Sequence, residues 1–406
     1  MSLATQPGVC RKDVRVAWLM PSLVRGYYWQ PGLREFAKLF PNSKVFTTLW
    51  PGYARGCEGT FQVRHLPGGR FVVLEKRPEG NDRGFLYAPP RIILELIRFR
   101  PQVVLAVAFT FWTLCAAVYK ALFGCRLIIL WGGNSPIATY ESSRVRTLLR
   151  RLIARFVDAV LSNTQAGGDY MRDFLRISPA KVIVHPYGAP DPEVLSAESH
   201  EDQAVEQIPH PVFLCVARLI EGKGISALLD AGALVKEQTG REFSLVIVGG
   251  GPDRERLESY ARQLGLGRYI HWAGNVNYSS LGAYYHQCDA LVFPTYEDIW
   301  GWVTLEAMVF GKAVLCSKYA GSSEVVRHGE NGFVFDPKNP GELASLMKRF
   351  IVDGGLAERF GRKSTEIMKH YTPQKVAEVI ARLALGEGPG LDAGQSQSEA
   401  QAPLAL

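Results

Sequence analysis

The order of apolar segments along the chain is the feature that most restricts its fold. Short apolar runs rich in Val, Ile and Leu alternate with longer segments of helical period, and the alternation starts again after a polar stretch at residues 195–211. Strands separated by helices build parallel sheets that are covered by helices on both faces. The sequence therefore predicts an α/β protein with two domains, each built on a parallel sheet.

Each half of the chain is expected to form a Rossmann-like domain, the first over residues 1–205 and the second over 206–370. Predicted strands lie at 14–20, 44–49, 71–74, 103–107, 126–131, 212–216, 243–248, 269–272, 290–293 and 313–316. Predicted helices lie at 32–39, 91–99, 144–157, 225–236, 254–263, 280–286 and 303–310. A further helix over 371–385 is expected to pack back on the first domain. Residues 386–406 lack an apolar period, which is typical of a disordered tail.

Charge and cysteine content narrow the functional classes. The formal net charge of +7 is concentrated in residues 1–200, which carry 26 Lys and Arg against 14 Asp and Glu. A basic half favours acidic partners, but the chain has no helix-turn-helix, zinc or aromatic RNA-binding signature, so no nucleic-acid partner is expected. The seven cysteines form no C-x-x-C pair, and this predicts a reducing, cytoplasmic location without a disulfide framework.

Two segments of the first half bear on membranes. Residues 103–119 carry no charge, but their length only reaches the lower limit for a spanning helix, and their β-branched start favours a buried strand that leads into a packed helix. Residues 144–157 have apolar side chains on one helical face, which we expect to pack on the domain. Their other face is either solvated or in contact with an anionic membrane surface. The arginines of that face are Arg144, Arg150, Arg151 and Arg155.

Two basic residues, Arg218 and Lys223, lie between the predicted strand 212–216 and the helix that follows. Ligands of open α/β sheets bind at this carboxyl edge, and an Arg with a Lys beside a helix start suits a diphosphate. The alternative is that both are surface charges of a loop. The glycine run after strand 243–248 also has two interpretations, a phosphate contact or a tight turn, because it lacks the spacing of the dinucleotide fingerprint.

Residues 291–316 predict a strand, a loop, a helix and a second strand. The loop brings two acids and a glycine to a helix start, where the backbone amides of Gly301, Trp302 and Val303 can bind an anion. Glu306 lies one turn further into the helix, and a carboxylate there suits hydrogen bonds to sugar hydroxyls.

These segments together resemble the retaining glycosyltransferases of glycosyltransferase family 4. That family has the GT-B fold, in which two Rossmann-like domains face each other across a cleft. The resemblance covers about residues 210–370. The residues that carry it are Ala217-Arg-x4-Lys-Gly224, Val248-Gly-Gly-Gly-Pro252, Trp272-Ala-Gly274, the Asp298-x7-Glu306 element and Glu330-Asn-Gly332.

The resemblance implies how a nucleotide diphosphate sugar would be bound. Arg218 and Lys223 would neutralise the diphosphate, Glu306 would bind the ribose hydroxyls, and Asp298 would touch the donor sugar. The donor is expected to be UDP- or GDP-linked, with no cofactor and no metal ion. The other donor-binding residues that the resemblance implies are Gly250, Ala273, Gly274, Val276, Glu297, Gly301, Trp302 and Val303.

The chain departs from the family pattern at two places. The first acid of the acid-x7-Glu element is normally Glu, so Asp298 either makes an altered sugar contact or leaves this contact to Glu297. Several relatives have a catalytic His in the N-terminal domain, where this chain has Trp131-Gly-Gly-Asn134. That role cannot be carried over, and Asn134 or Ser135 is the candidate to orient the acceptor instead.

The acceptor is expected in the cleft, against residues 21–30 and 131–135. The aromatic run Tyr27, Tyr28 and Trp29 suits sugar rings or lipid chains, and Arg25 suits a phosphate or carboxylate. The alternative for the aromatic run is packing against neighbouring helices. The predicted acceptor-binding residues are therefore Arg25, Tyr28, Trp29 and Asn134.

The leading hypothesis is a retaining, hexosyltransferase-type glycosyltransferase. Its acceptor would be a glycan, a lipid-linked molecule or a small molecule, and it would be cytoplasmic, with peripheral attachment to the inner face of the membrane as an option. The alternative is a non-catalytic sugar-nucleotide-binding or scaffold subunit of a glycosylation complex. The retained Arg218, Lys223 and Glu306 argue against that alternative.

Overall fold

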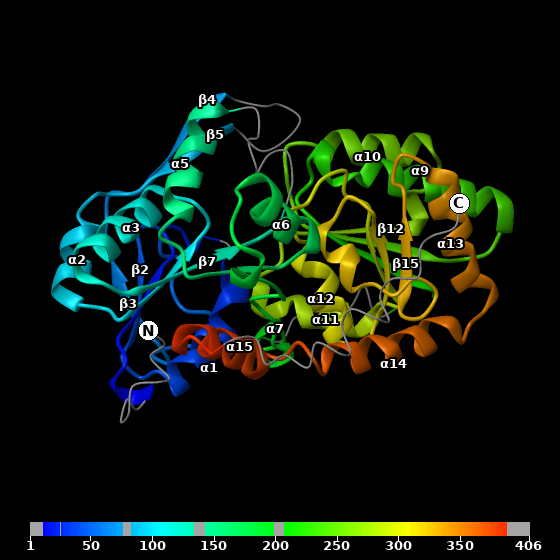
Figure 1. Ribbon diagram of the computed structural model, residues 1–406. Helices are drawn as coiled ribbons and strands as arrows, with labels where there is room; N and C mark the ends of the chain where they lie inside the picture. The colour runs from blue at the N-terminus through cyan, green and yellow to red at the C-terminus, as the bar shows by residue number, and fades with distance from the viewer. Residues whose placement is uncertain (1–10, 25, 76–82, 134–142, 199–206, 388–406) are drawn as a thin grey trace.

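The structure is a computed structural model that describes residues 11–24, 26–75, 83–133, 143–198 and 207–387. Two parallel sheets lie side by side, one in each half of the chain (Figure 1). In spatial order the N-terminal sheet consists of β3 (Gln62–His65), β2 (Ser43–Thr47), β1 (Val16–Leu19), β6 (Val103–Val107), β7 (Arg126–Trp131), β8 (Ala159–Ser162) and β9 (Val182–Val184). The C-terminal sheet consists of β12 (Ile270–Gly274), β11 (Ser244–Val248), β10 (Val212–Val216), β13 (Ala290–Phe293), β14 (Ala313–Ser317) and β15 (Gly332–Phe335).

Helices connect the strands and cover the sheets. Those of the N-terminal domain are α1 (Gln30–Leu39), α2 (Ile92–Phe99), α3 (Phe111–Phe123), α5 (Arg144–Ala154), α6 (Gln165–Asp169) and α7 (Pro192–Leu195). Those that follow are α9 (Ile225–Thr239), α10 (Arg254–Gln263), α11 (Leu281–Gln287), α12 (Trp302–Val309), α13 (Pro340–Val352), α14 (Leu356–Met368) and α15 (Pro373–Leu385).

Both faces of each sheet are buried, which explains why the strands are apolar at nearly every position. In β1, Val16 and Trp18 join the core beneath α1, whereas Ala17 and Leu19 join the core beneath α2 and α3. Successive side chains of a strand point to opposite faces, so a strand with cores on both sides cannot alternate between apolar and polar residues. The continuous apolar runs of the sequence follow from this two-sided burial.

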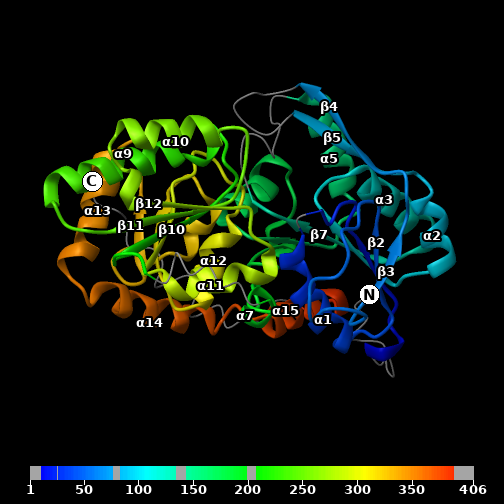
Figure 2. The ribbon, with the colours of Figure 1, turned by 180° about the vertical axis from the view of Figure 1, so that it is seen from behind.

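The last helix returns to the first domain. Figures 1 and 2 show α14 and α15 running along one side of the molecule, with α15 beside α1. Val376, Ile380 and Leu383 of α15 lie in the same core as Trp18, and Arg126 Nε donates a hydrogen bond to the Leu383 carbonyl at 2.6 Å. The C-terminal end of the described chain is thereby packed on the N-terminal sheet.

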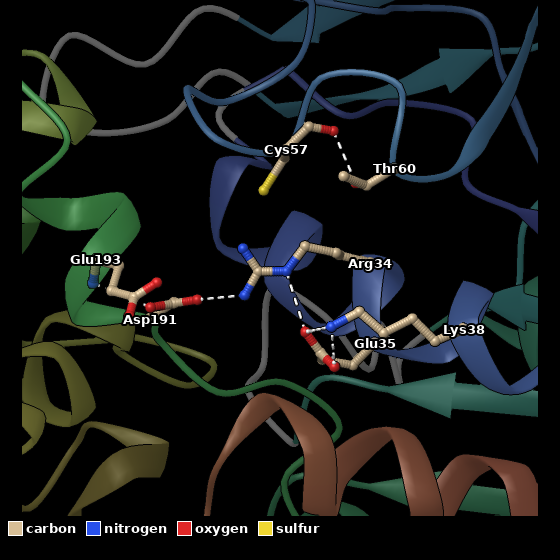
Figure 3. A network of polar contacts seen from close by, with 7 residues as sticks. All are labelled: Arg34, Glu35, Lys38, Cys57, Thr60, Asp191 and Glu193. Carbon is tan, nitrogen blue, oxygen red and sulfur yellow. Dashed lines mark hydrogen bonds and ion pairs between the residues drawn. The ribbon is translucent and has the colours of Figure 1, made fainter.

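A polar network holds the end of the N-terminal domain in place (Figure 3). Arg34 of α1 bonds Asp191 Oδ2 at 2.7 Å and Glu35 Oε1 at 3.0 Å, and Lys38 bonds the same Glu35 carboxylate. Asp191 also accepts the Glu193 amide and thereby caps α7 near the end of the N-terminal domain. Cys57 lies beside the network, and burial raises the pKa of its thiol to about 11 even though Arg34 favours the thiolate.

Residues 71–74 are a strand, but not a strand of the parallel sheet as expected. They belong to β4 (Arg70–Glu75), which pairs antiparallel with β5 (Arg83–Tyr87) in a separate hairpin. Residues 103–119 form β6 and most of α3, as the β-branched start predicted. None of the helices in the described segments is both long and apolar enough to cross a membrane.

The orientation expected for residues 144–157 is wrong. Val145 and Leu148 of α5 are 78% and 72% exposed, whereas Arg150 is only 9% exposed. The inward face is held by Ile153 and by Arg150, which donates to the Tyr170 hydroxyl at 2.7 Å and lies over the Trp131 ring. The aromatic surroundings of the guanidinium therefore decide which face of α5 points inward.

Candidate active site between the two domains

A cavity of about 710 Å³ lies between the two domains. The N-terminal domain contributes the ends of β6 and β7, and the C-terminal domain contributes the end of β10 and the loop from Asp298 to Gly301. Ligands of parallel α/β sheets bind outside the carboxyl ends of the strands, and here such ends from both sheets line one space. This is the arrangement that the predicted cleft requires.

Lys223 and Asp298 form an ion pair in the wall of the cavity. Lys223 Nζ lies 2.5 Å from Asp298 Oδ2, and the two side chains are 18% and 23% exposed. Asp298 Oδ1 also accepts the Trp300 amide at 3.1 Å, which fixes the carboxylate at the start of the loop. A cation that is positioned but still partly accessible can exchange its carboxylate for the phosphate of a ligand.

Arg218 follows the end of β10, in the connection that also carries Lys223. Its side chain is exposed and is outside the set of residues that line the cavity. The two residues predicted to bind a diphosphate thus come from the same connection between β10 and α9, but only Lys223 faces the cavity in this state.

The amino end of α12 faces the same space. Gly301 precedes the helix with φ = 96°, and a Cβ at this position would lie 2.5 Å from a ring carbon of Phe293. A glycine is therefore needed for this turn. Gly301, Trp302 and Val303 all line the cavity, where the first amides of the helix carry its positive dipole end.

Glu306 lies deeper in α12 and is buried, with 3% of its surface exposed. The Tyr285 hydroxyl donates to Glu306 Oε2 at 2.8 Å, and burial raises the pKa of the Glu306 carboxyl to about 7. The hydroxyl of Tyr278 is also buried next to this carboxyl and, like that of Tyr285, opposes the rise in its pKa. Glu306 is thus placed behind the cavity wall rather than on its surface.

The glycine run after β11 has a packing function. A Cβ on Gly249 would lie 2.0 Å from the Ala217 carbonyl oxygen, and one on Gly251 would lie 2.2 Å from the Leu219 carbonyl oxygen. Leu219 donates its amide to the Gly250 carbonyl at 3.0 Å. The run lets this loop lie directly against the segment that carries Arg218.

The remaining residues predicted to bind the donor lie around these loops. Gly250 is half-buried at the end of β11, and Gly274 is buried at the end of β12, where its carbonyl accepts the Gly249 amide at 2.7 Å. Ala273 and Val276 are half-buried beside it. None of these four residues lines the cavity between the domains.

Of the two neighbouring acids, only Asp298 lines the cavity. Glu297 is half-buried, and its amide and carbonyl both bond the Thr295 hydroxyl. Within the described residues, no three His, Cys, Asp or Glu side chains lie close enough together to hold a metal ion.

The predicted acceptor residues separate into three cases. Tyr28 lines the cavity and stacks on Trp302 of the C-terminal domain, with ring centroids 4.5 Å apart. Trp29 does not line the cavity: it is 7% exposed and stacks on Tyr187 in the N-terminal core at 4.7 Å. Arg25 and Asn134 lie outside the described residues.

A model of the family described as glycosyl transferases group 1 matches residues 198–367, the half that contains Lys223, Asp298 and Glu306. The match covers less than half of the chain and places its likeness to the group 1 glycosyl transferases in the C-terminal domain. An uncharacterised glycosyltransferase of Methanocaldococcus jannaschii is 35% identical over 168 residues, which are 41% of this chain and 43% of that protein. The D-rhamnosyltransferase WbpZ of Pseudomonas aeruginosa is 30% identical over 253 residues, or 58% of this chain and 63% of that protein. The chain thus matches about half of the length of these relatives.

The solved structures extend the comparison to the N-terminal domain. HepE from Anabaena, crystallised with UDP, superposes with a TM-score of 0.69 at 18% identity and covers 91% of this chain and 99% of HepE. At this identity the likeness concerns the fold. The predicted GT-B fold is confirmed by the two parallel sheets and by this superposition.

Several residues that line the cavity were not predicted to belong to the site. Arg150 and Tyr187 line the N-terminal wall, and Ile299 reaches across from the C-terminal side. The Ile299 carbonyl oxygen lies so close to Gly133 that a Cβ there would be 2.5 Å away. The Gly-Gly pair after β7 was the available signal, because two glycines at a strand end allow another backbone to approach closely.

Proposed function

We propose that this chain is a retaining glycosyltransferase that transfers a sugar from a nucleotide diphosphate sugar to an acceptor hydroxyl. The observation that carries the proposal is the shared wall of Lys223 and the amino end of α12, which faces the N-terminal domain across the cavity. A cation and a helix start together suit a diphosphate. The acceptor would bind against the opposite wall, which the N-terminal domain provides.

Donor binding would exchange the partner of Lys223. The diphosphate would take the ammonium group from Asp298, and the released carboxylate would accept hydrogen bonds from hydroxyls of the donor sugar. Arg218 would turn from its exposed position towards the second phosphate, and Glu306 would accept the ribose hydroxyls. Asp298 is the proposed sugar contact in preference to Glu297, since only Asp298 lines the cavity.

The transfer would occur on one face of the sugar. The bond from the anomeric carbon to the diphosphate oxygen breaks, and the acceptor oxygen forms its bond to the same carbon on the same face. The acceptor proton passes to the departing diphosphate oxygen. Lys223, Arg218 and the amides at the start of α12 stabilise the negative charge that develops on the leaving group. No metal ion is part of the proposal.

The donor would be UDP- or GDP-linked, and the UDP bound in HepE supports the first of these. The acceptor would be a glycan, a lipid-linked molecule or a small molecule that reaches Tyr28. The six cysteines in the described part of the chain are all unpaired, which agrees with a cytoplasmic active site. An anionic membrane surface is a further proposed partner.

The test is a thermal-shift screen of UDP, GDP and their sugars with the purified chain, followed by measurement of nucleotide release with candidate acceptors. We expect one nucleotide family to raise the melting temperature. We also expect Lys223→Ala to lower turnover by about a hundredfold or more, as for loss of one oxyanion donor. Binding without turnover for any acceptor would favour a non-catalytic subunit, and the absence of any shift would contradict the proposal.

A further inference from the structure

Exposed large apolar side chains are concentrated on one domain. The described residues include 17 such side chains, and only Ile299 and Val352 belong to the C-terminal domain. Apart from Val24, the others lie on α2, α3, α5 and the β4–β5 hairpin. We call this set the apolar flank: Phe71, Val73, Phe85, Tyr87, Leu94, Ile97, Phe111, Val118, Leu122, Phe123, Val145, Leu148, Leu149 and Leu152.

The elements of the apolar flank are neighbours. Helix α3 contacts both α2 and α5. Figures 1 and 2 show the β4–β5 hairpin next to α5 at the same end of the N-terminal domain. The exposed groups are large: Leu148 is 72% exposed and Leu122 is 70% exposed. A concentration of exposed apolar side chains on neighbouring elements marks a surface that another body covers.

The charge of the same elements is strongly positive. Within the bounds of α2, α3, α5, β4 and β5 the sequence has eight Lys and Arg but only two Asp and Glu. Helix α5 alone has the sequence RVRTLLRRLIA, without an acid. An amphipathic surface that combines exposed Leu and Phe with Arg is typical of proteins that lie in the interface of an anionic membrane.

We propose that the apolar flank inserts into the surface of an anionic lipid bilayer, and that the acceptor is taken from that bilayer. The second part rests on the proposed function, whereas the first does not. The leucines enter the boundary of the acyl chains, and the exposed Arg144 and Arg155 contact lipid phosphates. This reverses the orientation expected from the sequence alone, in which only the arginine face met the membrane.

The geometry of α5 links the membrane to the active site. Arg150 on the inner face of this helix lines the cavity, while Leu148 and Leu152 on the outer face belong to the apolar flank. A helix with its side chains is about 10 Å across, so the lipid surface and the cavity are separated by little more than one helix diameter. An acceptor head group can therefore reach the cavity while its chains stay in the bilayer.

A second copy of the chain fits the apolar flank less well than a membrane. Symmetric pairing would bring Arg144, Arg151 and Arg155 of one copy close to those of the other, and like charges at an interface oppose association. Among its described residues, the C-terminal domain offers only the separate side chains of Ile299 and Val352 as exposed large apolar partners. Anionic lipid satisfies both the apolar and the basic groups.

The experiment is flotation of the full chain with vesicles of phosphatidylcholine alone or of phosphatidylcholine with phosphatidylglycerol. We expect binding to the anionic vesicles only. The double variant Leu148→Ser/Leu152→Ser should lose about a hundredfold in affinity, because burial of each leucine is worth about a decade. Arg144→Gln/Arg155→Gln should lose about fivefold per arginine. The matched control is Val352→Ser, which removes an exposed apolar side chain of the C-terminal domain and should bind as the wild type.

Three outcomes would overturn the proposal: no binding to anionic vesicles, equal loss in Val352→Ser, or a wild-type dimer in sedimentation that the leucine variant abolishes. The thermal shift with UDP or GDP tests the proposed function separately. A chain that binds a nucleotide but no anionic vesicle would contradict the membrane proposal alone. Since the leucines are exposed and do not line the cavity, the leucine variant should keep the wild-type melting temperature and nucleotide shift. Loss of both the melting temperature and the nucleotide shift would mean that the leucine variant is misfolded. In that case the binding of Arg144→Gln/Arg155→Gln to anionic vesicles tests the proposal.

Discussion

The buried carboxyl of Glu306 predicts that nucleotide binding strengthens as the pH rises through neutrality. Burial raises the pKa of this group from 4.5 to about 7, and the Tyr285 hydroxyl only partly offsets that effect. Below this pH the free protein therefore holds a proton on Glu306. Ribose hydroxyls donate to a carboxylate, so binding favours the ionised form and releases the proton. The association constant should rise by up to about tenfold per pH unit below pH 7 and level off above it.

The same pKa difference affects folding. The pKa of Glu306 is higher in the folded than in the unfolded protein, so the stability associated with its proton is fully present below about pH 4.5. That stability is lost as the pH rises to about 7, and the loss is at most about 3 kcal/mol. Glu306→Gln keeps an oxygen for the Tyr285 hydroxyl and cannot ionise. The variant should therefore gain stability relative to the wild type between these pH values.

Calorimetry in buffers of different ionisation enthalpy measures the proton that is released. At pH 6 the wild type should release more protons on binding UDP or GDP than Glu306→Gln does, and at pH 8 the two should agree. The comparison removes the titration of the phosphates of the nucleotide itself. Glu255→Gln, at an exposed position of α10, is the matched control and should behave as the wild type. Equal proton release from Glu306→Gln and the wild type at pH 6 would refute the reasoning.

Three further predictions concern packing around the cavity. Tyr28→Ala should raise the KM for the acceptor more than the KM for the donor, which steady-state kinetics measures. Trp29→Ala should mainly lower the free energy of unfolding, by about 3 kcal/mol or more, since its ring lies in the core. Urea unfolding measures that loss. Gly301→Ala places a residue with a Cβ in the left-handed backbone region and brings that Cβ against Phe293. Urea unfolding should show a loss of at least about 1–2 kcal/mol in the free energy of unfolding. The control Gly354→Ala places its Cβ in open space and should show no such loss. Arg34→Met removes the cation that the buried carboxylates of Glu35 and Asp191 share, and should lower the free energy of unfolding by about 3 kcal/mol at pH 7. An unchanged midpoint of unfolding would contradict a stabilising role of Arg34.

Much of the second domain could be predicted because its signals are local. The strand at 290–293 and the helix at 254–263 agree with the structure to the residue, since apolar runs and helical periods are bounded there by turn residues. In the first domain, β3, β5, β8 and β9 were not predicted. Gln62–His65 is a polar edge strand and Val182–Val184 has three residues, so both depend on their neighbours in the sheet rather than on their own pattern.

The orientation of α5 shows what periodicity leaves open. An amphipathic pattern says that two faces of a helix differ, but the inward face depends on what lies beneath it. Arg150 meets the rings of Phe109, Trp131 and Tyr170, which come from three distant segments. No property of the helix alone contains that information. The hairpin β4–β5 was assigned to the parallel sheet for a similar reason, because strand propensity does not identify the partner.

Some residues of the candidate site could likewise be predicted from local sequence, whereas others needed the structure. Lys223, Asp298 and the start of α12 could be predicted because each lies where a strand ends and a helix begins within one half of the chain. The ion pair between Lys223 and Asp298 joins residues 75 positions apart and needed the structure. The burial of Trp29 needed it as well, since an aromatic run has the same composition in a core and in a binding site.

The affinity of UDP and GDP for the wild type and for Lys223→Ala tests the central claim most directly. Calorimetry should show that the variant binds the preferred nucleoside diphosphate at least about tenfold more weakly, as expected for loss of a hydrogen bond to a charged group. The corresponding nucleoside, which has no phosphate, should bind both proteins alike. Lys348→Ala, at an exposed position of α13, is the matched control and should bind as the wild type. Equal affinity of the wild type and Lys223→Ala for the diphosphate would contradict the assignment of the cavity as a nucleotide-sugar site.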